Sequence, residues 1–312
     1  EYPAFRTIAV GQAVWVIARD GVRIRSGSGM STDSSADFEI VLEPGWNDFG
    51  NPFHFPVSWA DVKVDSEAAL SGPFTYRGRW QSPSEVPVLE PWEGYTIWNP
   101  SGQRTVLRVP AREANRRAGK VQAHGLPEGA WQIRIVAQVE DAVDAINRIG
   151  QIPGASEGWD RYDVPEPPPV GDYVSLVFPK KEWIRYAGDY TADYRPMGTD
   201  GVWTFEVRTP IERSTVQLSF QDLEHLPGGY GVVLFDLDTR EEVDLTSQSR
   251  YTFPSGGGKI HRRFQLVVGT PDEVDLLREN LNPVPRAFSL FQNHPNPFNP
   301  ETTIQYQLPI ES

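Results

Sequence analysis

The alternation of apolar and polar side chains at every second residue is the feature that most limits what this chain can fold into. The pattern recurs in the ranges 131–137, 173–178, 202–207, 216–220 and 264–268. Side chains of a β-strand point alternately to opposite faces, so this period is typical of strands with one buried face. The 27 glycines and 28 prolines interrupt the chain often, which favours many short strands over long helices. The sequence therefore predicts an all-β fold.

Two β-sandwich-like modules are predicted along the chain. Residues 1–115 form the first, which we expect to be shortened at its N-terminal end, and the apolar run at 13–18 predicts a buried strand within it. The stretch 111–119 is charged and lacks the apolar rhythm, which places the module boundary there. Residues 116–270 form the second module, because strand patterns recur there between turn-rich spacers. Within it, the range 141–150 is compatible with either a strand or a short helix.

A short helical linker is predicted over 271–285, followed by a last segment of residues 286–312. Thr270 is a favourable N-cap, Pro271 suits the first helical position, and Glu273 completes a capping box. A pair of prolines then ends the helix and stiffens the chain that follows.

Composition excludes several classes of function. A net charge of −13 argues against nucleic-acid binding, because no basic cluster is present to neutralise phosphates. The absence of cysteine excludes disulfides, thiolate metal sites and thiol nucleophiles. No apolar stretch approaches the ~20 residues that a membrane-spanning helix needs, so no membrane insertion is expected.

Catalytic motifs are weak in this sequence, and we predict that the chain is not itself an enzyme. It holds neither a Gly-x-Ser-x-Gly nucleophile turn nor a His-Glu-x-x-His zinc motif. A hydrolase with an unrecognised site is kept as an alternative, and Glu93, between Trp92 and Gly94, is the carboxylate to test first. We interpret Glu93 as a turn residue. A catalytic domain upstream in a parent protein is compatible with this prediction.

Aromatic side chains of the first module invite a carbohydrate-binding hypothesis, because sugars stack on aromatic faces. The set comprises Trp46, Trp59, Trp80, Trp92, Tyr95 and Trp98. Trp59 and Trp80 have polar neighbours and are the predicted ligand platforms. The competing interpretation, which we favour, is that these rings fill a small β core.

Asp160 and Asp163 are the candidate metal ligands, with Asp141 and Asp144 upstream. Carboxylates suit calcium, which would tie a loop together as a structural ion. The competing interpretation is a turn in which the Asp side chains accept hydrogen bonds from their own backbone. No other cofactor is predicted.

A proline- and asparagine-dense string lies in the last segment. Its defining residues are Asn293, Pro295, Asn296, Pro297, Phe298, Asn299 and Pro300. From Asn293 to Ile304 the chain resembles the opening of the type A C-terminal sorting domain of type IX secretion substrates. The resemblance implies export across the outer membrane of a Gram-negative bacterium by the type IX machinery. Only the first strand of that domain is present, so we expect an incomplete domain whose range 300–308 is mobile or adds to a sheet edge.

Further ranges resemble accessory modules that precede such sorting domains in large exported proteins, namely 44–53, 57–62, 91–95 and 160–169. The resemblance implies an extracellular or outer-surface location without implying chemistry. We therefore expect a non-catalytic C-terminal region that acts as a structural or adhesive spacer, with a surface glycan or protein as candidate partner. The first alternative is a carbohydrate-binding module of an extracellular enzyme.

Overall fold

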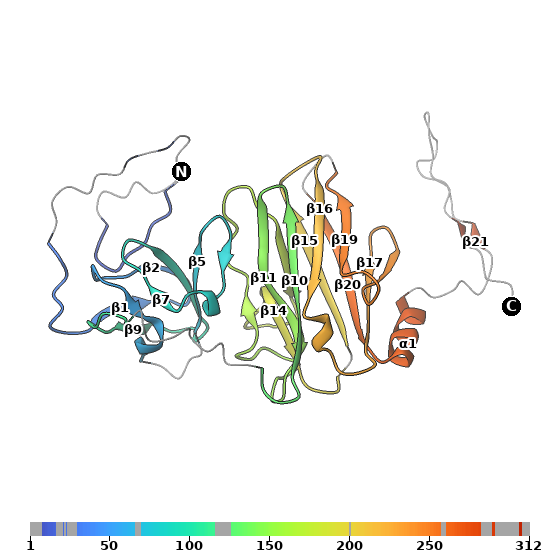
Figure 1. The fold of residues 1–312 in the computed structure, drawn as a ribbon, viewed down its shortest axis with the longest axis horizontal. Coiled ribbons are helices and arrows are strands. Elements are labelled where there is room, and N and C mark those ends of the chain that lie inside the picture. Colours follow the sequence, from blue (N-terminus) through green and yellow to red (C-terminus); the bar gives the residue numbers. More distant parts are fainter. Residues whose placement is uncertain are drawn as a thin grey trace.

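The computed structural model describes residues 8–16, 21, 23, 30–65, 70–115, 126–199, 201–256, 260–281, 289–290 and 306–307. Strands dominate these residues and gather in two modules that lie side by side (Figure 1). The predicted all-β fold class is therefore confirmed. Within the same residues, no helix combines the length and the apolar character that crossing a bilayer requires.

The first module is built from short strands in three small antiparallel sheets, with the orders β2-β8-β5-β6, β1-β9-β4 and β3-β7. Two 3₁₀ turns, η1 (Trp59–Asp61) and η2 (Pro83–Glu85), lie between strands. Apolar residues of several strands meet in one core, including Leu42, Phe49 and Ile97. The strands are β1 (Phe38–Leu42), β2 (Gly45–Gly50), β3 (Val57–Ser58), β4 (Lys63–Val64), β5 (Ser71–Tyr76), β6 (Trp80–Gln81), β7 (Val88–Leu89), β8 (Gly94–Asn99) and β9 (Thr105–Val109).

The second module has longer strands in one continuous sheet, ordered β18-β17-β20-β15-β13-β14-β11-β10-β16-β19, with β12 also paired to β14. A 3₁₀ turn, η3 (Leu223–His225), follows β16. The strands are β10 (Trp131–Val139), β11 (Ala142–Gln151), β12 (Val164–Pro165), β13 (Ser175–Lys180), β14 (Gly188–Arg195), β15 (Val202–Thr209), β16 (Thr215–Gln221), β17 (Gly231–Asp236), β18 (Glu241–Asp244), β19 (Arg250–Pro254) and β20 (Ile260–Gly269).

Strand β13 divides this long sheet into two facing layers. Its first residues, Ser175 to Val177, pair with β15, whereas Phe178 to Lys180 pair with β14. Apolar side chains of both layers meet in one core. Along β10 the apolar residues are buried at every second position, as the alternation predicts. The largest buried side chains of this core include Trp131, Trp203, Phe178, Phe205 and Phe264.

The range 141–150, left open by its periodicity, is a strand. β11 follows β10 through a tight turn at Glu140, where φ is +49°, and pairs with β10 from Ala142 to Gln151. A Cβ added at Gly150 would lie 2.1 Å from the carbonyl oxygen of Trp131, so the two backbones approach closely. Pairing with a neighbouring strand therefore decides the conformation here.

The predicted helix is present as α1 (Pro271–Leu281). The backbone N–H of Thr270 donates to Glu273 Oε2 at 2.8 Å, which satisfies one orphan amide at the helix start. Val274 is buried and anchors the helix on the outer face of β17 and β20, against Val233, Phe235 and Val267. The helix is thus packed against the second module (Figure 1).

Two short strands are described in the last segment. β21 (Ser289–Leu290) pairs with β22 (Tyr306–Gln307) in antiparallel register. The motif residues Asn293, Pro295, Asn296, Pro297, Phe298, Asn299 and Pro300 lie outside the described residues. Within the range 300–308, the described residues Tyr306 and Gln307 therefore pair with Ser289 and Leu290 at the start of the last segment.

Candidate functional site

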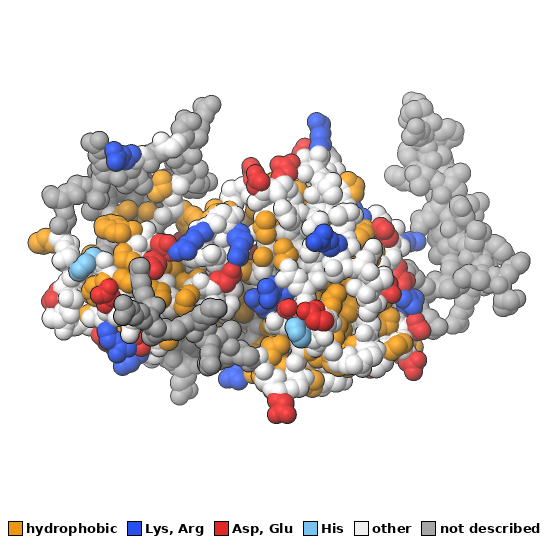
Figure 2. All heavy atoms as spheres, viewed as in Figure 1, with side chains coloured by type: hydrophobic (Ala, Val, Ile, Leu, Met, Phe, Trp, Pro, Cys, Tyr) orange, Lys and Arg blue, Asp and Glu red, His pale blue; other side chains and the backbone are white. Residues whose placement is uncertain are grey.

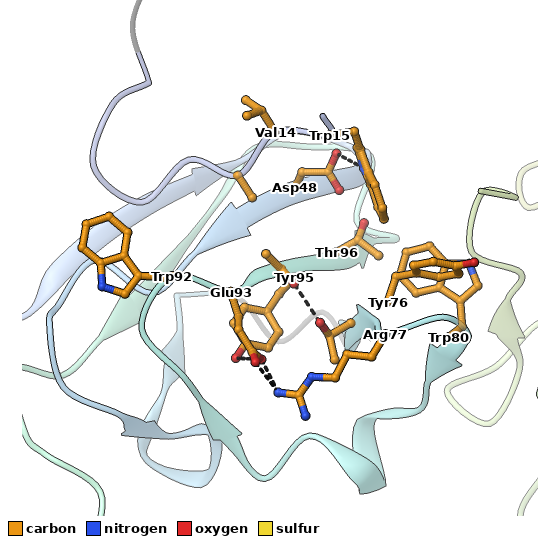
Figure 3. A pocket seen from close by; sticks show the side chains of 13 residues that line it. Val14, Trp15, Asp48, Tyr76, Arg77, Trp80, Trp92, Glu93, Tyr95 and Thr96 are labelled. Carbon is orange, nitrogen blue, oxygen red and sulfur yellow. Dashed lines mark hydrogen bonds and ion pairs between the residues drawn. The ribbon is translucent and has the colours of Figure 1, made fainter. Parts of the chain in front are cut away.

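A cavity of about 310 Å³ opens on the first module (Figure 3). This volume lies at the lower end of the range of about 300–1,000 Å³ that is usual for small-ligand pockets. Strands β2, β5 and β8 supply much of its lining, and the segment 13–15, the β5–β6 hairpin and the turn before β8 supply the rest. The lining residues are Ala13, Val14, Trp15, Asp48, Thr75, Tyr76, Arg77, Trp80, Trp92, Glu93, Gly94, Tyr95 and Thr96.

One wall of the cavity is aromatic. The Trp15 ring centroid lies 6.1 Å from that of Tyr76 and 5.8 Å from that of Trp80, both in edge-to-face geometry. Trp15 is 51% exposed, although the run at 13–18 was predicted to be a buried strand. That prediction is wrong over the described residues 13–16, which form no strand. The backbone of the described part of this segment pairs with β2 at an isolated bridge between Gln12 and Phe49, so no ladder forms among these residues to bury their side chains.

Trp92 lies on the other side of the cavity from Trp15, Tyr76 and Trp80 (Figure 3). Its side chain is 91% exposed, and its φ of +68° is in the left-handed region that favours glycine. A non-glycine residue there costs on the order of 1–2 kcal/mol. The turn between β7 and β8 thus holds an indole in solvent at a cost in backbone strain.

Polar groups lie between the two aromatic sides. The Trp15 indole N–H donates to Asp48 Oδ2 at 3.1 Å. Arg77 donates to both carboxylate oxygens of Glu93, and this hydrogen bonding raises the pKa of Arg77. Burial raises the pKa of Tyr95, so its hydroxyl stays protonated and donates to Glu93 Oε2 at 3.3 Å. The Glu93 carboxylate is therefore held by Arg77 and Tyr95. None of these contacts tests for catalysis, so the prediction that the chain is not an enzyme stays a prediction.

The two tryptophans predicted as ligand platforms lie in different settings. Trp59, in η1, is half-buried and packs against the core of the first module, away from the cavity. Trp80 lines the cavity but is only 9% exposed, and its indole N–H donates to the Pro168 carbonyl of the second module at 3.2 Å. Their predicted ligand role stays a prediction. The exposed rings at this site are Trp15 and Trp92. Trp15 was missed because its apolar neighbours predicted a buried strand. Trp92 lies in a Pro-Trp-Glu-Gly turn, and this turn motif is the sequence feature that could have indicated its exposure.

Aromatic side chains also join the two modules. Phe74 and Trp80 of the first module form one buried cluster with Ile146 of the second. Nearby, the Trp159 and Tyr186 rings of the second module stack at 4.0 Å, and both contact Trp98 of the first edge-on. A further hydrogen bond runs from Arg185 to the Ser101 carbonyl at 3.0 Å. The modules are therefore connected by packed rings as well as by the chain.

Asp160 and Asp163 lie in a turn, and most of their carboxylate oxygens accept hydrogen bonds from backbone N–H groups of that turn. Asp160 accepts from the N–H groups of Tyr162 and Ser156, each at 2.7 Å, and Asp163 Oδ2 accepts from the Asp160 N–H at 2.8 Å. Asp163 Oδ1 is buried, and no group of the described residues donates a hydrogen bond to it. Burial raises the pKa of Asp163 to about 8. This geometry is that of an Asp-stabilised turn, and the predicted calcium stays a prediction.

A second pair of buried carboxyl groups lies where the modules meet. Asp144 and Glu166 line a void of about 20 Å³ together with Tyr76 and Trp80 of the first module. Burial raises the pKa of Asp144 to about 6. Burial, and next the negative charge of Asp144, raise the pKa of Glu166. Burial therefore makes both carboxyl groups harder to ionise than exposed carboxyl groups, because their charged forms are less well solvated there.

Charges on the described surface are mixed. On the face drawn in Figure 2, basic and acidic side chains are interspersed over both modules. Ion pairs are frequent on the described surface, such as Arg104 with Glu43 and Arg263 with Asp238. No large single-sign patch is drawn among the described side chains on that face.

Searches of protein-family models, curated proteins and solved structures found no match to this chain. The chemistry of the cavity and of the contact between the modules is therefore inferred from geometry.

Proposed function

We propose that this chain is a non-catalytic region of an exported cell-surface protein, in which two β modules act as one rigid spacer. The proposal of export and surface location rests on the resemblance of residues 293–304 to a sorting domain. The spacer role is supported by the packing between the modules, above all by Trp80, which is buried against the second module.

Two linked domains move relative to each other by default, unless their interface is large and apolar. Here the contact is aromatic, and truncating a buried tryptophan typically costs about 3–5 kcal/mol. The Trp80 indole also has its N–H bonded to the Pro168 carbonyl, which fixes the direction of the ring. Such a contact favours a single orientation of the modules, and a fixed orientation suits a spacer that holds a neighbouring domain away from a surface.

Distance measurements between the modules test the spacer proposal. Because the chain has no cysteine, Ser34→Cys and Thr252→Cys place one spin label on an exposed position of each module. We expect a single narrow distance distribution by double electron–electron resonance. Adding Trp80→Ala should broaden the distribution, and Trp59→Ala, which alters only the first module, should not. A broad distribution in the parent protein would contradict a rigid spacer.

Export is tested separately in the native host. Removing codons 293–300 from the parent gene should trap the protein in the periplasm, while surface labelling of the unmodified protein should be positive. Unchanged surface labelling after the deletion would remove the sorting role.

A further inference from the structure

We infer that the cavity between Trp15 and Trp92 binds a neutral saccharide. The inference does not depend on export or on rigid coupling of the modules, because every lining residue belongs to the first module.

The distribution of tryptophan points to this cavity. All ten tryptophans of the chain lie in described residues, and the large exposed side chains include only two of them, Trp15 and Trp92. Both line the same cavity. The other eight are buried or half-buried. Two solvent-facing indoles at one pocket provide the flat apolar faces on which pyranose rings stack.

The backbone at Trp92 gives independent support. A positive φ at a bulky residue is strained, and such strain is found where a side chain is held for a purpose. Trp92 is 91% exposed, so burial of its ring does not repay the strain within the described residues. Stacking against a ligand would supply the missing contact.

The charges of the cavity select against anions. Asp48 and Glu93 are acidic and Arg77 is basic, so the charged groups of the lining sum to one net negative charge. Arg77 is already bound by Glu93, which leaves it a weak anchor for a phosphate or sulfate. Asp48 is exposed and retains lone pairs that accept from sugar hydroxyls. These groups favour a ligand that carries hydroxyls and no charge.

The arrangement of the rings also argues against a small organic cation. A quaternary ammonium is bound by several aromatic faces that enclose one point. Here Trp15, Tyr76 and Trp80 meet edge-to-face, and Trp92 lies across the cavity from them (Figure 3). Faces set apart in this way fit a ligand of more than one ring, such as the end of an oligosaccharide.

The test is an array of neutral oligosaccharides of glucose, galactose, mannose and xylose, followed by calorimetric titration of the strongest binder. We expect binding that Trp92→Ala weakens at least tenfold and that Asp48→Ala also weakens. Ile184→Ala, which truncates a fully exposed apolar side chain of the second module, is the matched surface control and should leave affinity unchanged. Trp59→Ala should also leave it unchanged, since Trp59 does not line the cavity.

Three outcomes would overturn the inference. One is the absence of binding to every neutral glycan at millimolar concentration. Another is binding that persists in Trp92→Ala but is lost in Trp59→Ala, which would move the site to the platform predicted from sequence. The third is preference for an acidic glycan or for tetramethylammonium, tested in the same titration. Because Trp92 is exposed, its truncation should leave the far-ultraviolet circular dichroism spectrum unchanged, which separates lost binding from lost folding.

Discussion

The two modules use the same side chain in opposite ways. In the second module, Trp131 and Trp203 are buried between the layers, with ring centroids 5.7 Å apart. In the first module, Trp15 and Trp92 stand in solvent. Strands of eight to ten residues, such as β15 and β20, can bury a whole row of side chains, whereas many strands of the first module have two residues. The two exposed rings of the first module lie outside its strands, Trp15 in the segment before β1 and Trp92 in the turn before β8.

The largest expected effect is in the core of the second module. Trp203→Ala should lower the free energy of unfolding by about 3–5 kcal/mol, because it opens a cavity and leaves the Asp193 carbonyl without its indole donor. Urea unfolding followed by circular dichroism measures the loss, and Trp203→Phe should lose less. Trp92→Ala in the first module should stay within about 0.5 kcal/mol of the parent. Equal losses at both positions would break the contrast between the modules.

The pH dependence of stability should also come from the second module, which buries its acids. The pKa of Asp163 is raised to about 8, from an ordinary value near 3.8. The folded state therefore keeps a proton that the unfolded state has released, and the free energy of unfolding falls as pH rises from about 4 to about 8. The slope for one such group is at most about 1.4 kcal/mol per pH unit.

Asp163→Asn mimics the protonated carboxyl, so it should reduce the slope of the free energy of unfolding against pH. Relative to the parent, the variant should therefore be more stable at pH 8 than at pH 5. Unfolding curves at the two pH values measure the difference. Asp172→Asn, an exposed carboxyl in the same module, is the control and should follow the parent. A slope that Asp163→Asn leaves unchanged would assign the pH dependence to Asp144 and Glu166 instead.

The smallest expected effect is at the cavity. Trp92→Gly relieves the strained φ, so the variant should be as stable as the parent or more stable by up to about 1 kcal/mol. Saccharide binding should be lost in the same variant. Thermal unfolding measures the stability, and the titration described above measures saccharide binding. A clear loss of stability would show that the Trp92 ring supports the fold.

The sequence predicts structure well where a local pattern, such as side-chain alternation or a helix cap, matches the tertiary packing. Along β10 the alternation alone identifies the buried face, and at α1 the Thr270 cap identifies the helix start. At 141–150 the period was compatible with two structures, and the hairpin with β10 decided between them. At 13–16 an apolar run predicted burial, but whether a partner strand covers such a run is a property of the tertiary structure.

The candidate site was only partly predictable for the same reason. Trp92 lies in a turn motif, but the favoured interpretation of the sequence placed its ring in the core, whereas the ring is 91% exposed. Trp80 looked like a platform because its neighbours are polar, yet it packs against a second module more than 80 residues away in sequence. The burial of Asp163 likewise depends on chain that folds over it, and the Asp-x-x-Asp spacing carries no sign of that cover.

The position of two strands has a mechanical consequence. The chain enters the second module at β10, which is paired on one side with β11 and on the other with β16, and leaves it at β20, between β15 and β17. Neither is an edge strand. Both junctions lie at the same end of the module, because Trp131 at the start of β10 packs against Trp203, which pairs with Leu266 near the end of β20. An edge strand can detach by breaking one ladder, whereas detaching β10 or β20 would break two, so the module holds the chain firmly where it enters and where it leaves.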